Sequence, residues 1–156
     1  AVARPVQKGK EPMSAPPHDR PEPKMPHILI VEDESTTSWA LAEGLSDDGY
    51  TIDTFRTAEE ALFWLRSHRS DLVISDFQLP GLSGLDLAQK LTRGRHAQPV
   101  IVVTAYGSPE HVRDLMRAGV SEVFPKPFHV DELRRAVRRA LLSRPERRRS
   151  TLRKAA

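Results

Sequence analysis

The stretch DLVISDFQLPG, residues 71–81, predicts a buried β-strand that ends on an acid. Its run LVI is short, apolar and rich in β-branched residues, as are the strands of a parallel sheet covered on both faces. The strand is expected to end at Asp76, because the Pro80-Gly81 pair that follows favours a turn. The Asp76 carboxylate then lies at the rim of a sheet, where a ligand can reach it.

The region around this stretch alternates between similar strands and helical patterns. The expected strands cover residues 27–31, 50–55, 72–76, 99–104 and 122–124. The expected helices cover residues 35–48, 57–68, 83–93, 108–118 and 130–143. Five strands alternating with five helices through short loops predict an α/β fold, with a parallel sheet covered by helices on both faces.

Local signals mark several helix ends. Thr57 and Glu60 match a capping box, and Ser108 stands before a first-turn proline. Gly49 and Gly119 follow two helices at the place where a left-handed cap is expected. The helices also carry apolar residues that we interpret as packing residues: Leu133, Ala136, Val137, Ala140 and Leu141 on one stripe, and Phe63, Trp39 and Trp64 elsewhere.

Composition excludes some classes of protein. The chain has 156 residues, 38% of them hydrophobic, and no apolar run approaches the roughly 18 residues of a membrane helix. Its first residues lack the apolar segment of a secretory signal, and it contains no cysteine. We therefore expect a cytoplasmic protein without membrane insertion.

The positive net charge of +3 comes from the two ends of the chain. Residues 1–25 form a basic, proline-rich arm with few large apolar side chains, and such a segment is expected to be disordered. Residues 26–143 form the single predicted domain, which has an excess of acids. Residues 144–156 form a basic tail that is also expected to be disordered.

Chemically useful side chains stand where the predicted strands end. Glu32 and Asp33 follow the first strand, Asp76 ends the third, Thr104 ends the fourth, and Lys126 follows the fifth. Ligands of open α/β sheets bind beyond the carboxyl ends of the strands, so these groups are expected to converge. Carboxylates packed together repel one another unless a cation joins them, and oxygen ligands favour a hard ion such as Mg²⁺.

This set of residues predicts phosphoryl transfer. Asp76 is the candidate nucleophile, because a bound cation lets its carboxylate meet an anionic phosphoryl donor. The Lys126 ammonium neutralises charge on the phosphoryl oxygens, and the Thr104 hydroxyl donates a hydrogen bond to them.

Four motifs in order resemble the CheY-like receiver domain of two-component response regulators: LIVEDE at 29–34, VISDFQLPGLSG at 73–84, VVTAYG at 102–107 and FPKPF at 124–128. The resemblance covers residues 26–143. It implies a flavodoxin-like, doubly wound, five-stranded parallel sheet with strand order 2-1-3-4-5. It also implies a histidine kinase or phosphotransfer protein as the phosphoryl donor.

The resemblance assigns a role to each site residue. Asp76 is the phosphoacceptor, Asp33 ligates Mg²⁺ directly, Glu32 holds it through water, and the backbone carbonyl of Gln78 is a further ligand. Thr104 and Lys126 contact the phosphoryl group.

Three further positions bear on tuning and switching. The Lys126-Pro127 bond resembles the cis peptide of the family, and Gln78 and Tyr106 occupy positions that tune how fast the acyl phosphate is lost. The family usually carries an aromatic residue where this chain has Val123, so the aromatic switch of the family is not expected here. Phe124 is adjacent, but strand alternation points it to the other face of the sheet.

The function expected from these residues is a single-domain receiver that is phosphorylated on Asp76 and then changes its binding to a partner. Such a protein catalyses its own phosphorylation and slow dephosphorylation and does not turn over other substrates. The resemblance places the target on the surface of helix 4, strand 5 and helix 5, and a phosphorylation-linked homodimer is a further expectation.

A phosphatase of the haloacid dehalogenase type is disfavoured, because it needs a second acid two residues after the nucleophile, where this chain has Gln78. Three alternatives stay open. A pseudo-receiver would bind its partner constitutively, and the chain could also be a receiver cut from a larger regulator or hybrid kinase. The basic tail is interpreted as a solvated segment, with weak electrostatic binding to an acidic partner or nucleic acid as the alternative.

Overall fold

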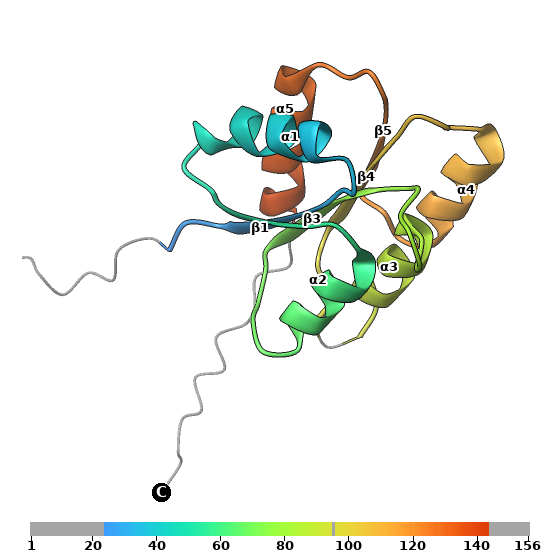
Figure 1. The fold of residues 1–156 in the computed structure, drawn as a ribbon, viewed down its shortest axis with the longest axis horizontal. Helices are drawn as coiled ribbons and strands as arrows, with labels where there is room; N and C mark the ends of the chain where they lie inside the picture. Colours follow the sequence, from blue (N-terminus) through green and yellow to red (C-terminus); the bar gives the residue numbers. More distant parts are fainter. Residues whose placement is uncertain (1–23, 95, 144–156) are drawn as a thin grey trace, which may run out of the picture.

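The computed structural model describes residues 24–94 and 96–143 of the chain. Five parallel strands form one sheet in the order β2-β1-β3-β4-β5, as predicted (Figure 1). Their bounds are β1 His27–Val31, β2 Thr51–Phe55, β3 Leu72–Asp76, β4 Val100–Thr104 and β5 Glu122–Pro125. The predicted arm and tail, residues 1–25 and 144–156, lie outside the described residues except for Lys24 and Met25.

Five helices alternate with the strands and cover both faces of the sheet (Figure 1). They are α1 Ser35–Ser46, α2 Ala58–Leu65, α3 Gly84–Leu91, α4 Pro109–Arg117 and α5 Val130–Leu142. α1 and α5 pack on one face, whereas α2, α3 and α4 pack on the other. Within the described residues no helix is long and apolar enough to cross a membrane.

The core consists of two apolar layers separated by the sheet. Ile28, Ile30 and Ile74 are fully buried beneath α1 and α5, and their neighbours Leu29 and Val73 are fully buried on the opposite face. Both faces of these strands must be apolar because helices cover both, which explains why the runs ILIV and LVI do not alternate with polar residues.

The predicted helices are each one to four residues too long. Thr57, Ser83 and Ser108 were included in the predicted helices but are N-caps with extended backbone angles. Their side chains accept hydrogen bonds from the helix, so they favour the helix start without being helical. Gly49 and Gly119 have φ of +81° and +88°, which confirms the left-handed positions expected after α1 and α4.

The predicted capping box at the start of α2 is only half formed. Thr57 accepts from the Glu60 amide, but the Glu60 carboxylate accepts from the Arg56 amide, one residue before the cap. The complete capping box occurs instead at the start of α3, where Ser83 and Asp86 exchange hydrogen bonds. The prediction was wrong because a capping carboxylate can reach a neighbouring amide with similar geometry.

Two aromatic side chains do not pack as predicted. Trp39 is 66% exposed and Phe63 is 71% exposed, whereas Trp64 is half-buried between the rings of His27 and His68. The helical pattern alone could not separate these cases, because α1 and α2 each bury only a narrow stripe.

A charge cluster fixes the end of α1 against α5. The Asp48 carboxylate accepts hydrogen bonds from Arg134 Nε at 3.0 Å and Nη2 at 2.6 Å, and from Arg138 Nη2 at 3.2 Å. The Arg134 hydrogen bonds hold the pKa of Asp48 below its usual value. Arg134 and Arg138 therefore point toward the end of α1 and join it to α5.

Candidate functional site

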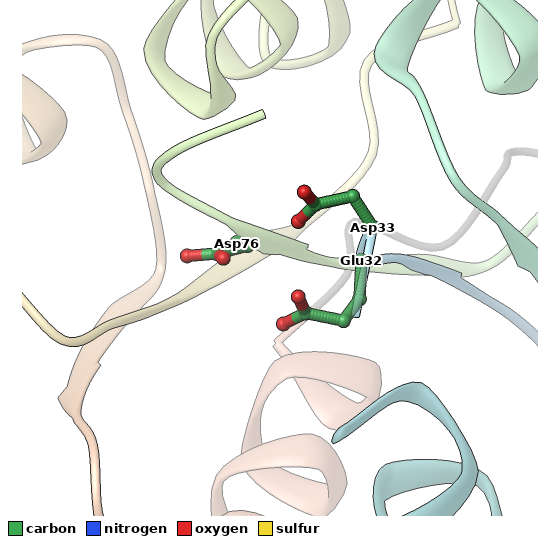
Figure 2. Close-up of side chains that lie close together, drawn as sticks. All are labelled: Glu32, Asp33 and Asp76. Atoms are coloured by element: carbon green, nitrogen blue, oxygen red, sulfur yellow. The ribbon is translucent and has the colours of Figure 1, made fainter. Parts of the chain in front are cut away.

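Three carboxylates meet at the carboxyl edge of the sheet, as the sequence predicted (Figure 2). Glu32 and Asp33 directly follow β1, and Asp76 ends β3. Because β1 and β3 are parallel neighbours, their ends lie side by side. One oxygen of each carboxylate lies within 4.8 Å of an oxygen of the other two.

Lys126 brings a positive charge into the cluster from the end of β5. Its Nζ donates to Glu32 Oε2 at 2.9 Å and to Asp76 Oδ2 at 3.3 Å. The Lys126 amide also donates to the Thr104 carbonyl at 2.8 Å, which ties the loop to β4. The Lys126-Pro127 bond is cis, as expected.

Burial and pairing act in opposite directions on these charges. Glu32 is only 3% exposed, and this burial raises its pKa against the lowering effect of the Lys126 hydrogen bond. Burial lowers the pKa of Lys126, but the hydrogen bonds and charges of Glu32 and Asp76 outweigh it, so the net shift is upward. Lys126 therefore stays protonated and the cluster carries excess negative charge beside it.

Thr104 is buried at the end of β4, with 1% of its surface exposed. Its hydroxyl oxygen accepts from the Tyr106 amide at 3.0 Å, and among the described residues it makes no hydrogen bond to Asp76. This bond orders the loop after β4, while the Tyr106 side chain is 63% exposed. The hydroxyl keeps its proton free to donate, because the amide occupies only a lone pair.

The loop after β3 wraps around Asp76. The Gln78 amide lies 3.4 Å from Asp76 Oδ1, and the Gln78 side chain is exposed. Gly84, at the start of α3, comes so close that a Cβ there would lie 2.2 Å from the Asp76 carbonyl oxygen. The motif contained Gly84, but its role was missed because the close approach joins residues eight positions apart.

Arg56 is a second residue that sequence analysis missed. It follows β2, and its Nη2 donates to the Asp33 carbonyl at 3.2 Å, so it supports the loop that carries Asp33. Nothing in the local sequence distinguishes this arginine from a solvated one, since the contact depends on the pairing of β1 with β2.

The two faces of β5 follow the predicted alternation. Val123 is half-buried and packs in the layer beneath α2, α3 and α4. Phe124 is buried in the opposite layer beneath α1 and α5. Phe124 therefore cannot take the place of an aromatic residue on the α4 side.

The donor set fits a hard divalent cation. Glu32, Asp33 and Asp76 supply only carboxylate oxygens, which Mg²⁺ and Ca²⁺ prefer, and the set includes no sulfur or imidazole ligand. The excess of negative charge around a single ammonium favours a further cation there.

Comparison with known proteins places the chain in a family. It matches the family described as "Response regulator receiver domain" over residues 28–138. It is 32% identical to the DNA-binding transcriptional regulator NtrC of Salmonella typhimurium over 114 residues, 73% of this chain and 24% of that protein. It is 35% identical to the two-component response regulator PhoP of Pseudomonas aeruginosa over 106 residues, 68% of this chain and 47% of that protein.

Solved structures agree with these relatives. The chemotaxis response regulator CheY4 of Vibrio cholerae superposes with a TM-score of 0.69 at 25% identity, covering 75% of this chain and 99% of that one. A putative response regulator from Chloroflexus aurantiacus gives 0.72 at 29% identity, covering 76% and 99%. The chain spans less than half the length of the curated relatives named above. The chain thus belongs to the response regulator receiver domain family of two-component systems.

Proposed function

We propose that this receiver domain accepts a phosphoryl group on Asp76 from a phosphohistidine of a histidine kinase or phosphotransfer protein. The observation that carries this proposal is the convergence of Glu32, Asp33 and Asp76 with Lys126 at one sheet edge. The acids can hold a cation, and Asp76 and Lys126 together offer a nucleophile and a positive charge to one phosphoryl group.

In the proposed transfer an Asp76 carboxylate oxygen attacks the phosphorus of phosphohistidine. A P–O bond forms as the P–N bond breaks, and the electron pair of the broken bond stays on the imidazole nitrogen. The product is an acyl phosphate on Asp76 and a free histidine on the donor. Lys126 already donates to Asp76 Oδ2, so its ammonium is placed to pair with a phosphoryl oxygen.

The proposed metal ligands are the side chains of Glu32, Asp33 and Asp76 and the carbonyl of Gln78. Mg²⁺ bound there would neutralise the repulsion between the carboxylates and an incoming phosphoryl group. Arg56 supports this set from outside through the Asp33 carbonyl. Gln78 offers no carboxylate that could activate water, so the acyl phosphate should persist long enough to act as a signal.

The proposed output is a change in binding at the surface of α4, β5 and α5. The Thr104 hydroxyl lies at the origin of the loop that leads to α4. Tyr106 and Met116 are 63% and 51% exposed there, and they offer contact area to a partner protein. With Val123 in β5, this output proceeds without an inward-moving aromatic side chain.

The test is intact-protein mass after incubation with acetyl phosphate and Mg²⁺. We expect one added phosphoryl group on the wild type and on Asp131→Asn, an exposed aspartate of α5, and none on Asp76→Asn or without Mg²⁺. If no variant gains mass, the domain is a pseudo-receiver that binds its partner constitutively.

A further inference from the structure

A pocket of about 320 Å³ lies at the amino edge of the sheet, opposite the acidic cluster. It opens between the loop that joins α2 to β3 and the loop that joins α3 to β4, both at the lower side of Figure 1. No residue of the acidic cluster lines it. Any ligand in this pocket would therefore be separate from the proposed phosphorylation.

The lining is strongly basic. Four of its residues are permanent cations and two are imidazoles, and none is an acid: Arg66, Arg69, Lys90, Arg93, His68 and His96. In the part of the chain that the structure describes, the four cations form no salt bridge with a carboxylate. Several like charges around one concave space raise the local concentration of anions.

Several of these side chains are held in place. The Arg69 Nη1 lies 2.7 Å from His96 Nδ1, which joins the two loops across the pocket. The Arg66 guanidinium lies over the Phe63 ring at 5.7 Å from its centroid. Preorganised side chains lose less entropy on binding a ligand than mobile ones.

A hydrogen bond between two buried residues of the lining joins the same two loops. Gln98 is only 8% exposed, and its amide oxygen accepts from the Ser70 hydroxyl. Both residues line the pocket, so uncharged polar groups stand there beside the cations.

Helix dipoles account for part of this charge only. α2 ends at Leu65 and α3 ends at Leu91, and cations near these carboxyl ends stabilise the helices. That explanation covers Arg66 and Lys90, which lie within one residue of a helix end. It does not explain the Arg69–His96 contact.

We propose that this pocket binds a compact phosphate-bearing anion, a di- or triphosphate group. Phosphate oxygens are acceptors that match the donors of the three guanidinium groups and of the Lys90 ammonium. The volume of 320 Å³ is at the lower end of the roughly 300–1,000 Å³ of small-molecule pockets. The lining contains no Phe, Tyr or Trp for stacking bases, which disfavours single-stranded nucleic acid as the ligand.

The first experiment is calorimetric titration of the full chain with sodium tripolyphosphate in EDTA. Removing Mg²⁺ prevents binding of phosphate at the acidic cluster, so Asp76→Asn should bind as tightly as the wild type. We expect one site, and Arg69→Gln/Arg93→Gln should weaken affinity at least tenfold. Arg147→Gln/Arg148→Gln removes the same charge from the basic tail and should leave affinity unchanged.

Two further arms identify the source and the place of binding. ATP binding as tightly as tripolyphosphate would mean that only the phosphates are recognised, whereas tighter ATP binding would mean a nucleotide ligand. In the wild type, backbone amide NMR shifts of residues 66–70 and 96–98 should move on titration.

The proposal is overturned if neither anion binds, or if the tail variant loses affinity as much as the pocket variant. Shifts confined to other residues would overturn it too.

Discussion

The Lys126 ammonium donates a 2.9 Å hydrogen bond to the nearly buried Glu32 carboxylate. This pair joins the ends of β5 and β1 across two intervening strands. It also places a fixed positive charge inside the set of acids that should hold Mg²⁺.

Removing this charge should strengthen metal binding while weakening phosphoryl transfer. In the wild type the Lys126 ammonium repels a Mg²⁺ ion bound by the carboxylates, and two like charges at such distances interact by about 1 kcal/mol or more. Lys126→Gln removes this repulsion, so we expect the Mg²⁺ Kd to fall several-fold. Phosphorylation by acetyl phosphate should slow, because no ammonium pairs with the phosphoryl oxygens. Calorimetry gives the Kd and intact mass gives the rate. Lys24→Gln, an exposed lysine, is the control, and an equal change in Kd there would contradict the account.

Gly84 should tolerate no side chain. In Gly84→Ala the new Cβ would meet the Asp76 carbonyl oxygen at 2.2 Å, so α3 must shift away from β3. We expect a loss of roughly 1–3 kcal/mol in unfolding free energy, the usual range for overpacking. Urea denaturation measures it.

Gly107→Ala is the matched control for this substitution. Its nearest heavy atom would be Thr104 Cγ2 at 3.9 Å, an ordinary contact. Equal stability losses in the two variants would show that the close approach at Gly84 does not matter.

The Thr104 hydroxyl should be needed for the order of the loop that follows β4. Thr104→Val keeps the shape of the side chain but leaves the Tyr106 amide without its acceptor. We expect a loss of about 1 kcal/mol in stability and faster amide hydrogen exchange at Tyr106. Thr104→Ser keeps the acceptor and should exchange as the wild type does; faster exchange in that variant would refute the role of the hydroxyl.

The cluster of Asp48 with Arg134 and Arg138 should make stability depend on pH in the acid range. The pKa of Asp48 in the folded protein lies below its usual value of about 3.9. The contribution of ionised Asp48 to the free energy of unfolding is therefore complete at pH values above the usual pKa, and it is lost as the pH falls through the folded pKa. Asp48→Asn should cost about 1 kcal/mol at pH 7, since the arginines are partly solvent-screened.

Thermal unfolding between pH 7 and pH 2 measures this dependence. The Tm difference between wild type and Asp48→Asn should shrink below about pH 4. Asp131→Asn, 80% exposed and 3.8 Å from Arg134, should change little at any pH. A Tm difference for Asp48→Asn that is constant across this range would contradict the electrostatic explanation.

The fold could be predicted from sequence because its signals are local and repeated. The strands β1, β3 and β4 are short, largely apolar runs, and the glycines at 49 and 119 mark helix ends by conformation alone. The convergence of Glu32, Asp33 and Asp76 followed from one general rule, since the carboxyl ends of parallel strands share an edge.

Contacts between distant side chains could not be predicted in this way. The approach of Gly84 to Asp76, the Arg56 bond to Asp33 and the basic pocket all depend on how loops pack after the sheet has formed. Likewise the exposure of Trp39 and Phe63 depends on how wide a stripe each helix buries, which spacing alone does not specify.

The central claim is that Asp76 is the phosphoacceptor, and locating the phosphoryl group tests it most directly. After incubation with acetyl phosphate and Mg²⁺, borohydride reduces an aspartyl phosphate to homoserine, and peptide mass spectrometry identifies the converted residue. We predict homoserine at position 76, with Glu32 and Asp33 unmodified. Conversion at either of those acids, or at none of the three, would contradict the account.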